Sequence, residues 1–347
     1  MKLDKKQLCH DLFSWYEKSH RQLPWREDIT AYKVWISEIM LQQTRVEAVK
    51  SYYQRFMKEV PTVFDLAKIN DEKLLKLWEG LGYYSRARNL KKAAFIIVEK
   101  YGGKIPDTYD ELITLPGIGD YTAGAILSIA YQKSYPALDG NVFRVLTRVF
   151  ENGVDILSSR GKKEIKDLLL QILPEQNCSL FTQAMMELGA TVCIPNGNPH
   201  CEKCPFSCYC LSHLHHKELL YPVKKSKKQR KIERRYVFLI TYRDKVLIQK
   251  RKNRGLLANF YEFPNVLVTD DTIEVDQFLK KFPSCEVEEI GDYKHIFTHI
   301  EWHMIGYLLK VSEQGEGIWA TLEQLEDVYP IPNAFMKYKQ KLKDILK

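Results

Sequence analysis

The stretch Leu115-Pro-Gly-Ile-Gly-Asp-Tyr-Thr-Ala-Gly124 decides the fold of the first part of this 347-residue chain. Gly117 and Gly119 permit a tight turn and let a ligand approach the backbone, because glycine has no Cβ. The small residues that follow predict a helix whose first amide groups face an anion such as a phosphate. The pattern is typical of a helix–hairpin–helix that binds the DNA backbone, although a turn that only connects two helices would have a similar composition.

Two carboxylates on either side of this hairpin are candidates for acid–base chemistry. Glu38 lies among apolar residues in the segment WISEIM, residues 35–40. Burial raises the pKa of a carboxyl group, which suits a proton donor near neutral pH. Taken alone, Glu38 would be an exposed helix residue, but the neighbouring LQQT (41–44) and the later Asp139 favour the acid. Asp139 follows the apolar segment 135–138, so we expect it at the edge of a core, where it could also cap the next helix. Asn141 is close enough in sequence to orient Asp139.

Four of the eight cysteines fall within 18 residues, and they are Cys193, Cys201, Cys204 and Cys210. Clustered thiolates hold soft metals or iron–sulfur clusters, and a packed apolar core gives no reason to gather them. An iron–sulfur cluster, a zinc site and a chance grouping all stay open on this pattern. Cys208 is expected to be a spare thiol within the loop. The other three are predicted to be buried small hydrophobic residues, namely Cys9, Cys178 and Cys285.

Composition limits the classes of protein only loosely. The formal net charge of +8 favours a polyanionic partner weakly, since many proteins without nucleic-acid partners are equally basic. No run of 18 apolar residues is present, and the N-terminus lacks the apolar core of a signal peptide. Clustered cysteines without such a signal indicate a reducing compartment. We therefore expect a cytoplasmic monomer without membrane contact, associated with the nucleoid in a bacterium.

The hydrophobic pattern changes once along the chain. Up to about residue 218, apolar residues recur at intervals of three and four, which predicts helices. Residues 224–235, KKSKKQRKIERR, contain eight basic residues and one acidic residue, so we expect a solvated linker that could also follow phosphates. The remainder predicts an α+β domain. Its expected strands are 236–242, 245–249, 293–297 and 302–311, with a tight turn at 243–244 and helices near 274–282 and 333–346.

Several segments in this order resemble the A/G-specific adenine DNA glycosylases, the MutY family, over nearly the whole chain. They are LPWR (23–26), WISEIMLQQT (35–44), GLGYYSRAR (80–88), LPGIGDYTAGAI (115–126), LDGNV (138–142), ELGA (187–190), the clustered cysteines and the C-terminal domain. The resemblance implies an all-α helix–hairpin–helix glycosylase followed by an α+β Nudix-like domain. The implied parts are a helical iron–sulfur domain (1–28 with 135–218), a six-helix barrel (29–134), a linker (219–235) and an 8-oxoguanine-recognition domain (236–347).

The resemblance also implies an activity. The family flips adenine out of the duplex and removes it when it is mispaired with 8-oxoguanine or guanine. Glu38 matches the acid that protonates adenine N7 and then handles the attacking water. Asp139 matches the carboxylate that stabilises the oxocarbenium-like sugar, as in glycoside hydrolysis. Tyr121 and Asn141 match residues that line this site.

Binding residues are carried over in the same way. Trp25 and Arg26 match the adenine pocket, and the four clustered cysteines match the ligands of one [4Fe–4S] cluster. Thr298 departs from the serine that the family has in its Phe-Ser-His loop, and the added methyl narrows the space for the lesion. The residues expected to contact DNA or 8-oxoguanine are Gln43, Thr44, Leu81, Tyr83, Gly117, Gly119, Phe297, Thr298 and His299.

One position separates this chain from a related class of enzyme. Endonuclease III-like enzymes carry a lysine nucleophile two residues after the second hairpin glycine, where this chain has Tyr121. Without that amine no Schiff base forms, so we expect a monofunctional glycosylase. A non-catalytic iron–sulfur DNA-binding protein would be expected to have lost Glu38 or Asp139. A Nudix hydrolase would need the acidic metal-binding box, which the C-terminal domain lacks.

Overall fold

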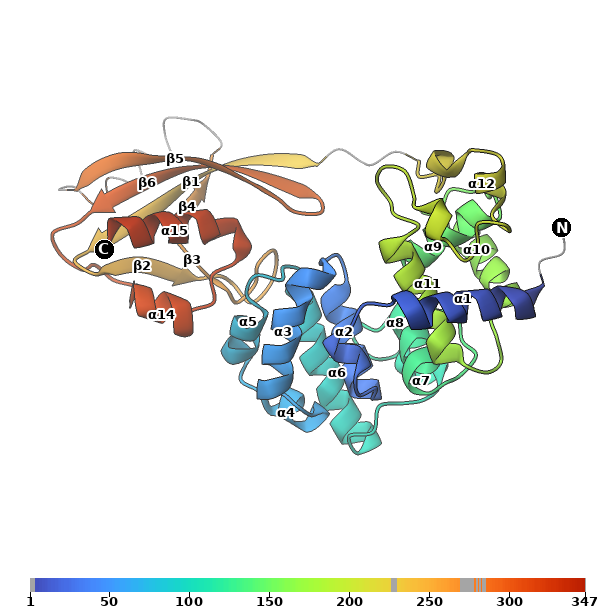
Figure 1. Cartoon of the computed structure of the whole chain (residues 1–347). Helices are drawn as coiled ribbons and strands as arrows, with labels where there is room; N and C mark the ends of the chain where they lie inside the picture. Colours follow the sequence, from blue (N-terminus) through green and yellow to red (C-terminus); the bar gives the residue numbers. More distant parts are fainter. Residues whose placement is uncertain are drawn as a thin grey trace. The chain divides into compact units, whose positions relative to one another are not determined.

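The computed structural model describes residues 4–225, 230–268, 278, 280, 282 and 285–346. They form two compact units, residues 1–69 with 88–226 and residues 70–87 with 227–347 (Figure 1). The first unit is helical, and the second contains a sheet with helices, which confirms the expected fold class. Residues 70–87 belong to the second unit together with the C-terminal residues. The expected six-helix barrel (29–134) and the other expected domain boundaries stay predictions.

The helical unit consists of helices joined by short turns. Its long elements are α1 (Lys5–Ser19), α2 (Ala31–Leu41), α3 (Val46–Glu59), α6 (Ser85–Tyr101, which begins in the second unit), α9 (Gly140–Val149), α10 (Ser159–Ile172) and α11 (Cys178–Thr191). Its short elements are η1 (Pro24–Arg26), α4 (Val63–Lys68), α7 (Tyr109–Leu112), α8 (Asp120–Ala125), the π-helix η2 (Ile126–Ala130), η3 (Cys201–Lys203), α12 (Leu211–Leu214) and η4 (Glu218–Leu220). Side-chain oxygens of Asp4, Thr30 and Ser158 accept hydrogen bonds from the first free amide groups of α1, α2 and α10.

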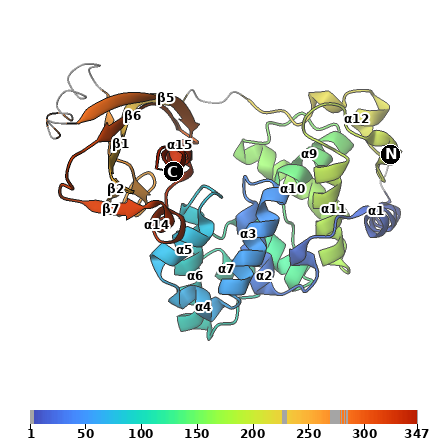
Figure 2. The same ribbon diagram turned by 60° about the vertical axis from the view of Figure 1, so that its left-hand side comes forward.

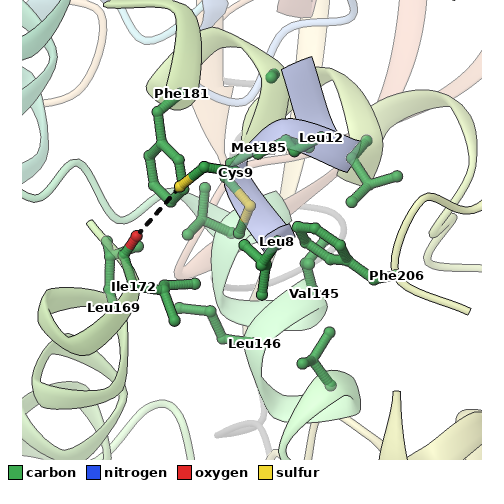
Figure 3. Close-up of a cluster of buried hydrophobic side chains, with 14 of the residues drawn as sticks. Leu8, Cys9, Leu12, Val145, Leu146, Leu169, Ile172, Phe181, Met185 and Phe206 are labelled. Carbon is green, nitrogen blue, oxygen red and sulfur yellow. Dashed lines mark hydrogen bonds between the residues drawn. The ribbon is translucent and has the colours of Figure 1, made fainter. Parts of the chain in front are cut away.

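A hydrophobic core joins α1 to the helices that follow the hairpin. The N-terminal helix packs against α10 and α11 (Figure 2). Leu8 and Leu12 of α1 are completely buried, and Phe206 of the cysteine loop packs into the same core (Figure 3). Cys9 lies there too, with its thiol 3.8 Å from the carbonyl oxygen of Ile172. The cysteine loop is therefore anchored in the core on which α9 rests.

The second unit is built on a mixed sheet. Its strands are β1 (Lys231–Tyr242), β2 (Lys245–Lys250), β3 (Tyr261–Glu262), β4 (Asn265–Leu267), β5 (Glu286–Ile296), β6 (Ile300–Lys310) and β7 (Ile318–Thr321), in the order β3-β2-β1-β6-β5 with β4 paired to β1 and β7 to β2. β1 and β6 are parallel, and the other pairs are antiparallel. Its helices are α5 (Asp71–Trp78), α14 (Leu322–Asp327), η5 (Asn333–Phe335) and α15 (Met336–Ile345).

α15 covers one face of this sheet (Figure 1). Tyr338 of α15 packs edge-on against Tyr293 of β5, with ring centroids 4.8 Å apart. A Cβ on Gly306 of β6 would lie 2.3 Å from the Tyr338 ring, so only glycine allows the helix to approach this closely. The contact fixes the position of α15 and of the segment that precedes it.

The sheet of this unit begins earlier in the chain than the sequence predicts. The first strand begins at Lys231 and not at residue 236, so the last part of the expected linker is in the sheet. This is possible because Glu233 accepts hydrogen bonds from Arg235 and from the indole of Trp302, which pairs the charges along the strand. The turn at Arg243 is confirmed, since Tyr242 pairs with Lys245. The expected helix at 274–282 falls almost wholly outside the described residues.

Among the described residues, no helix combines the length and the hydropathy that crossing a lipid bilayer requires.

Candidate active site

A cavity of about 510 Å³ lies in the helical unit, between the residues of α2, α8, α11 and the start of α9. It brings together eight residues that the sequence places far apart. They are Trp25, Arg26, Glu38, Gln43, Thr44, Tyr121, Asp139 and Asn141. The expected catalytic residues and the expected adenine pocket therefore share one cavity.

Glu38 projects from α2 and is only 6% exposed. The hydroxyl group of Tyr121 donates a hydrogen bond to its Oε2. Burial raises the pKa of Glu38 to about 7, with a further rise from the nearby charge of Asp139, while the hydrogen bond from Tyr121 acts in the opposite direction. A carboxyl group with this pKa is partly protonated at neutral pH, so Glu38 can donate a proton and later accept one.

Asp139 caps α9 and is held at both oxygens. Its Oδ1 accepts a hydrogen bond of 2.7 Å from the amide of Val142, and its Oδ2 accepts one of 2.7 Å from Nδ2 of Asn141. Burial raises the pKa of Asp139 above its ordinary value, and these two donors oppose the rise by stabilising the charged form. The capping role and the placement of a carboxylate in the cavity are thus compatible.

Arg144 fixes Asn141 in turn, and sequence reasoning did not find it. Arg144 is only 6% exposed, and its Nη2 donates hydrogen bonds to Oδ1 of Asn141 (2.8 Å) and to the carbonyl of Gly189 (2.7 Å). Nε of Arg144 donates to the carbonyl of Cys193 at 2.7 Å. A Cβ on Gly189 would lie 2.5 Å from Cβ of Asn141, so the small residue lets α11 approach the start of α9.

A buried charge cluster forms another wall of the cavity. Glu187 is completely buried, and Arg21 donates to both of its oxygens, at 2.6 and 3.0 Å. Arg26 donates to Oε2 of Glu187 at 2.8 Å. Burial raises the pKa of Glu187, but the hydrogen bonds from Arg21 and the charge of Arg26 outweigh it and leave the pKa below its ordinary value. A carboxylate in the apolar sequence AMMELGA was the available signal for this position.

The four clustered cysteines line a second small cavity in the same unit. Burial is the main cause that raises the pKa of Cys204 to about 12, and the other three cysteines add to the rise. Within the described residues, no three of these thiols lie within 4.8 Å of one another; the tight group there is Cys201, His213 and Glu218. All four thiols line this one cavity, so they are the residues that would hold a metal or a cluster there.

Arg148 adds a donor at this second cavity. It is 3% exposed, and its Nη1 donates hydrogen bonds to Sγ of Cys193 (3.3 Å) and to the carbonyl of Ile194 (2.9 Å). These hydrogen bonds hold Cys193 at the edge of this cavity, beside the other three cysteines.

The hairpin has the expected form between α7 and α8. Gly117 has a φ of +82°, and a Cβ there would lie 2.8 Å from Cβ of Asn89, so the turn requires glycine. Gly119 has an extended backbone that any residue adopts, and a Cβ there would meet no atom within 4 Å. The tight turn therefore does not require a glycine at position 119. The space around Gly119 is open, which leaves room for a ligand beside the backbone.

The remaining expected DNA contacts lie in the second unit. Phe297, Thr298 and His299 form the turn between β5 and β6, where the amide of Phe297 donates to the carbonyl of Ile300 at 2.8 Å. The last two are exposed at the tip. Tyr83 is 44% exposed, whereas Leu81 is 6% exposed, so its side chain would have to be uncovered to contact DNA.

The similarity of this chain to known proteins identifies its family. A model for "HhH-GPD superfamily base excision DNA repair protein" matches residues 36–175, and a NUDIX domain model matches residues 236–341. Adenine DNA glycosylase of Buchnera aphidicola subsp. Schizaphis graminum is 35% identical over 328 residues, which covers 91% of this chain and 93% of that protein. The chain belongs to the adenine DNA glycosylase family.

Other adenine DNA glycosylases match to a similar extent. The enzyme of Rattus norvegicus is 35% identical, in a match that covers 88% of this chain and 70% of that protein. The enzyme of Homo sapiens is 34% identical, in a match that covers 84% of this chain and 64% of that protein. A thermostable thymine-DNA glycosylase is similar in structure, with a TM-score of 0.55 and 28% identity over 61% of this chain and 97% of that one. Endonuclease III in a non-covalent DNA complex is also similar in structure, with a TM-score of 0.51 and 25% sequence identity. That match covers 62% of this chain and 98% of the endonuclease III chain. As a member of this family, the chain is a base-excision repair DNA glycosylase that binds DNA.

Proposed function

We propose that this enzyme hydrolyses the N-glycosidic bond of adenine mispaired with 8-oxoguanine or guanine in duplex DNA. The observation that carries the proposal is the cavity that holds both Glu38 and Asp139, with the pKa of Glu38 near 7. Adenine can reach such a cavity only when it is flipped out of the base stack.

The two carboxyl groups would perform different steps. Protonated Glu38 donates its proton to adenine N7, which makes the base a better leaving group. Asp139, oriented by Val142 and Asn141, stabilises the positive charge that develops on the sugar. Ionised Glu38 then accepts a proton from the attacking water. Tyr121 offers no amine to form a Schiff base, so the enzyme should release adenine without cutting the strand.

The charge cluster beside Glu38 suits adenine recognition. Glu187 itself is completely buried and already accepts hydrogen bonds from Arg21 and Arg26, which keep it ionised, so its part is to hold Arg26 in place. Arg26 contributes donors on the cavity wall, as the resemblance implied. Adenine presents acceptor nitrogens to such donors.

The mispair preference is tested by a panel of duplexes that differ in one base pair. Single-turnover assays should show adenine released opposite 8-oxoguanine and guanine, with at most slow release opposite thymine. A duplex with thymine opposite guanine is the control, since the match to a thymine-DNA glycosylase structure makes it the nearest competing substrate. Preferential release of thymine would contradict the proposed specificity.

The pH dependence of catalysis should report the protonation of Glu38. The acid must be protonated, and its pKa is raised to about 7, so the excision rate should fall about tenfold per pH unit well above that pH. Below it, the rate should hold until acid protonates Asp139, whose charge the reaction also needs. The hydrogen bond from Tyr121 lowers this pKa. Tyr121→Phe should therefore shift the fall in excision rate at alkaline pH (the alkaline limb of the pH–rate profile) to higher pH, whatever it does to the maximum rate.

Tyr109→Phe is the matched control for this measurement. Tyr109 donates a hydrogen bond of 2.7 Å to Asp120, a pair of the same chemistry that does not line the cavity. It should leave the limb where it is. An alkaline limb that stays in place or moves to lower pH in Tyr121→Phe would refute the assignment of the limb to Glu38.

We also propose that Cys193, Cys201, Cys204 and Cys210 hold one [4Fe–4S] cluster. When bound, the cluster would cross-link residues 193–210 through four iron–sulfur bonds and so hold the loop in shape. Phe206 anchors the loop in the core, and Arg144 links the Cys193 carbonyl to Asn141. The loop also carries Lys203, which could face a phosphate.

Cys201→Ser should lower the iron and acid-labile sulfide content, remove the visible absorption of the cluster and reduce the melting temperature. Cys208→Ser provides a control, because Cys208 is exposed in the same loop and lies outside the ligand set. It should keep full iron content. Full iron and sulfide in purified Cys201→Ser would exclude this cysteine as a ligand.

The side opposite adenine would be read by two other groups of residues. Gln43 and Thr44 lie at the cavity, and Gln43 has a φ of +57°. The turn Phe297–His299 and Tyr83 lie in the second unit. We propose that Gln43 and Tyr83 insert into the stack around 8-oxoguanine and that the turn contacts the lesion.

A further inference from the structure

Tyr83 belongs to a segment whose support comes from the C-terminal residues. Residues 70–87 form one compact unit with residues 227–347. Tyr83 itself is 44% exposed and has a φ of +48°, a left-handed conformation that is unfavourable for an aromatic residue. Such a conformation persists only where the surroundings hold it. The loop that presents this side chain is held by residues on both sides of it.

Arg86 supports the loop from inside. It is 8% exposed, and its Nη2 donates hydrogen bonds of 3.1 Å to the carbonyls of Leu81 and Gly82. The guanidinium also lies 5.4 Å from the ring centroid of Trp78 and 5.6 Å from that of Tyr83. Burial lowers the pKa of Arg86 to about 10, so it keeps its charge at neutral pH.

Residues 331–333, just before α15, support the loop from the C-terminal side. Nδ2 of Asn333 donates a hydrogen bond of 2.8 Å to the carbonyl of Gly80. The amide of Asn333 donates to the hydroxyl group of Tyr84 at 3.4 Å, and that ring lies 4.1 Å from the ring of Phe260. The amide of Ile331 donates to Oε1 of Glu79 at 2.9 Å. The loop is therefore bonded on both sides of Tyr83.

A buried charge network strengthens the same connection. Glu79 pairs with Lys76 at 2.7 Å and lies 3.9 Å from Lys339 of α15. Both lysines donate hydrogen bonds of 2.9 Å to the carbonyl of Leu325 at α14. The side chain of Lys339 is only 3% exposed, so this network is shielded from solvent. Hydrogen bonds and ion pairs thus connect α5 and the start of the loop to α14 and α15.

We propose that Asn333 is a positioning residue for Tyr83. By holding the Gly80 carbonyl, Asn333 keeps the loop in the conformation that presents Tyr83 to the DNA stack. The C-terminal residues then contribute to adenine flipping through this loop, in addition to any contact that the Phe297–His299 turn makes with the lesion. The inference rests on the proposed function, which gives Tyr83 its role at the mispair.

A double-mutant cycle separates positioning from plain structural support. Loss of one hydrogen bond that orders the loop should slow adenine excision opposite 8-oxoguanine about fivefold to tenfold in Asn333→Ala. If Asn333 acts through Tyr83, the same substitution in a Tyr83→Ala background should change the rate less than about twofold. Equal losses in both backgrounds, or no loss in the unchanged background, would overturn the proposal.

Two further variants separate the positioning role from poor folding and from a general effect of losing an asparagine in this unit. Asn333→Asp has the same shape without the Nδ2 donor, so it should reproduce the loss even if Asn333→Ala folds poorly. Asn265→Ala removes bonds to Phe263 and Arg235 elsewhere in the unit, and it should leave the excision rate within about twofold. An Asn333→Asp variant with the unchanged rate would count against the proposal.

A binding measurement keeps this test independent of catalysis. 2-Aminopurine placed at the adenine position and paired with 8-oxoguanine becomes more fluorescent when it leaves the stack. Asn333→Asp should lower this signal at saturating protein only when Tyr83 is present. A chain that flips the probe normally but releases no adenine would contradict the proposed activity, whereas normal flipping in Asn333→Asp would contradict the positioning role alone.

Discussion

Replacing Glu38 by Gln should reduce adenine release at least about 1000-fold while duplex binding stays within about threefold. The amide has nearly the same shape as the carboxyl group and still accepts the hydrogen bond from Tyr121, so the cavity should keep its form. It cannot donate an acidic proton or accept one from water. Single-turnover excision and equilibrium binding to the same duplex measure the two effects separately.

Glu99→Gln is a suitable control for this substitution. Glu99 is an exposed residue near the end of α6 and does not line the cavity. Its loss should change neither rate nor binding by more than about twofold. Adenine release at a near-normal rate by Glu38→Gln would show that another group supplies the proton.

Asp139→Asn should slow excision by about 100-fold to 1000-fold with little change in stability. Asparagine caps helices as well as aspartate does, so Oδ1 should still accept the hydrogen bond from Val142. What is lost is the negative charge that faces the developing positive charge on the sugar. The rate constant from a single-turnover assay and the melting temperature are the two readouts.

Asp139→Ala separates the two roles of this residue. It removes the cap as well as the charge, so it should lose about 1 kcal/mol of stability that Asp139→Asn keeps. Both variants should be similarly slow. If Asp139→Asn were as active as the unchanged enzyme, Asp139 would be a helix cap only.

The sequence predicts the residues that carry the chemistry better than the residues that hold them in position. WISEIM taken alone leaves Glu38 as an exposed helix residue, and only the neighbouring LQQT and the later Asp139 favour a buried acid; the structure buries Glu38 among these apolar residues. The cap at Asp139 is also local and is confirmed. Arg144 and Glu187 act through partners that are distant in sequence, such as the Cys193 carbonyl and Arg21. Their residue types are visible in the sequence, but their partners depend on tertiary packing.

In the second unit, too, the sequence predicts local structure but not the contacts between distant segments. Alternating apolar residues predict the strands 236–242 and 245–249, yet the charged residues 231–235 hide the true start of β1. The apolar stripe of α5 predicts a buried helix without naming its partner. Only the structure shows that α5 packs with the C-terminal residues, so that Asn333 reaches the Gly80 carbonyl. A prediction from one helix at a time cannot find this connection.

The central claim is that Glu38 and Asp139 hydrolyse the bond between adenine and its sugar. Its most direct test is a single-turnover reaction on a duplex with adenine opposite 8-oxoguanine, with free adenine and strand breaks measured together in the presence of borohydride. The account predicts one free adenine for each abasic site, an intact strand until alkali is added, and no trapped covalent adduct. Strand cleavage with a borohydride-trapped adduct, or an abasic site without free adenine, would contradict it.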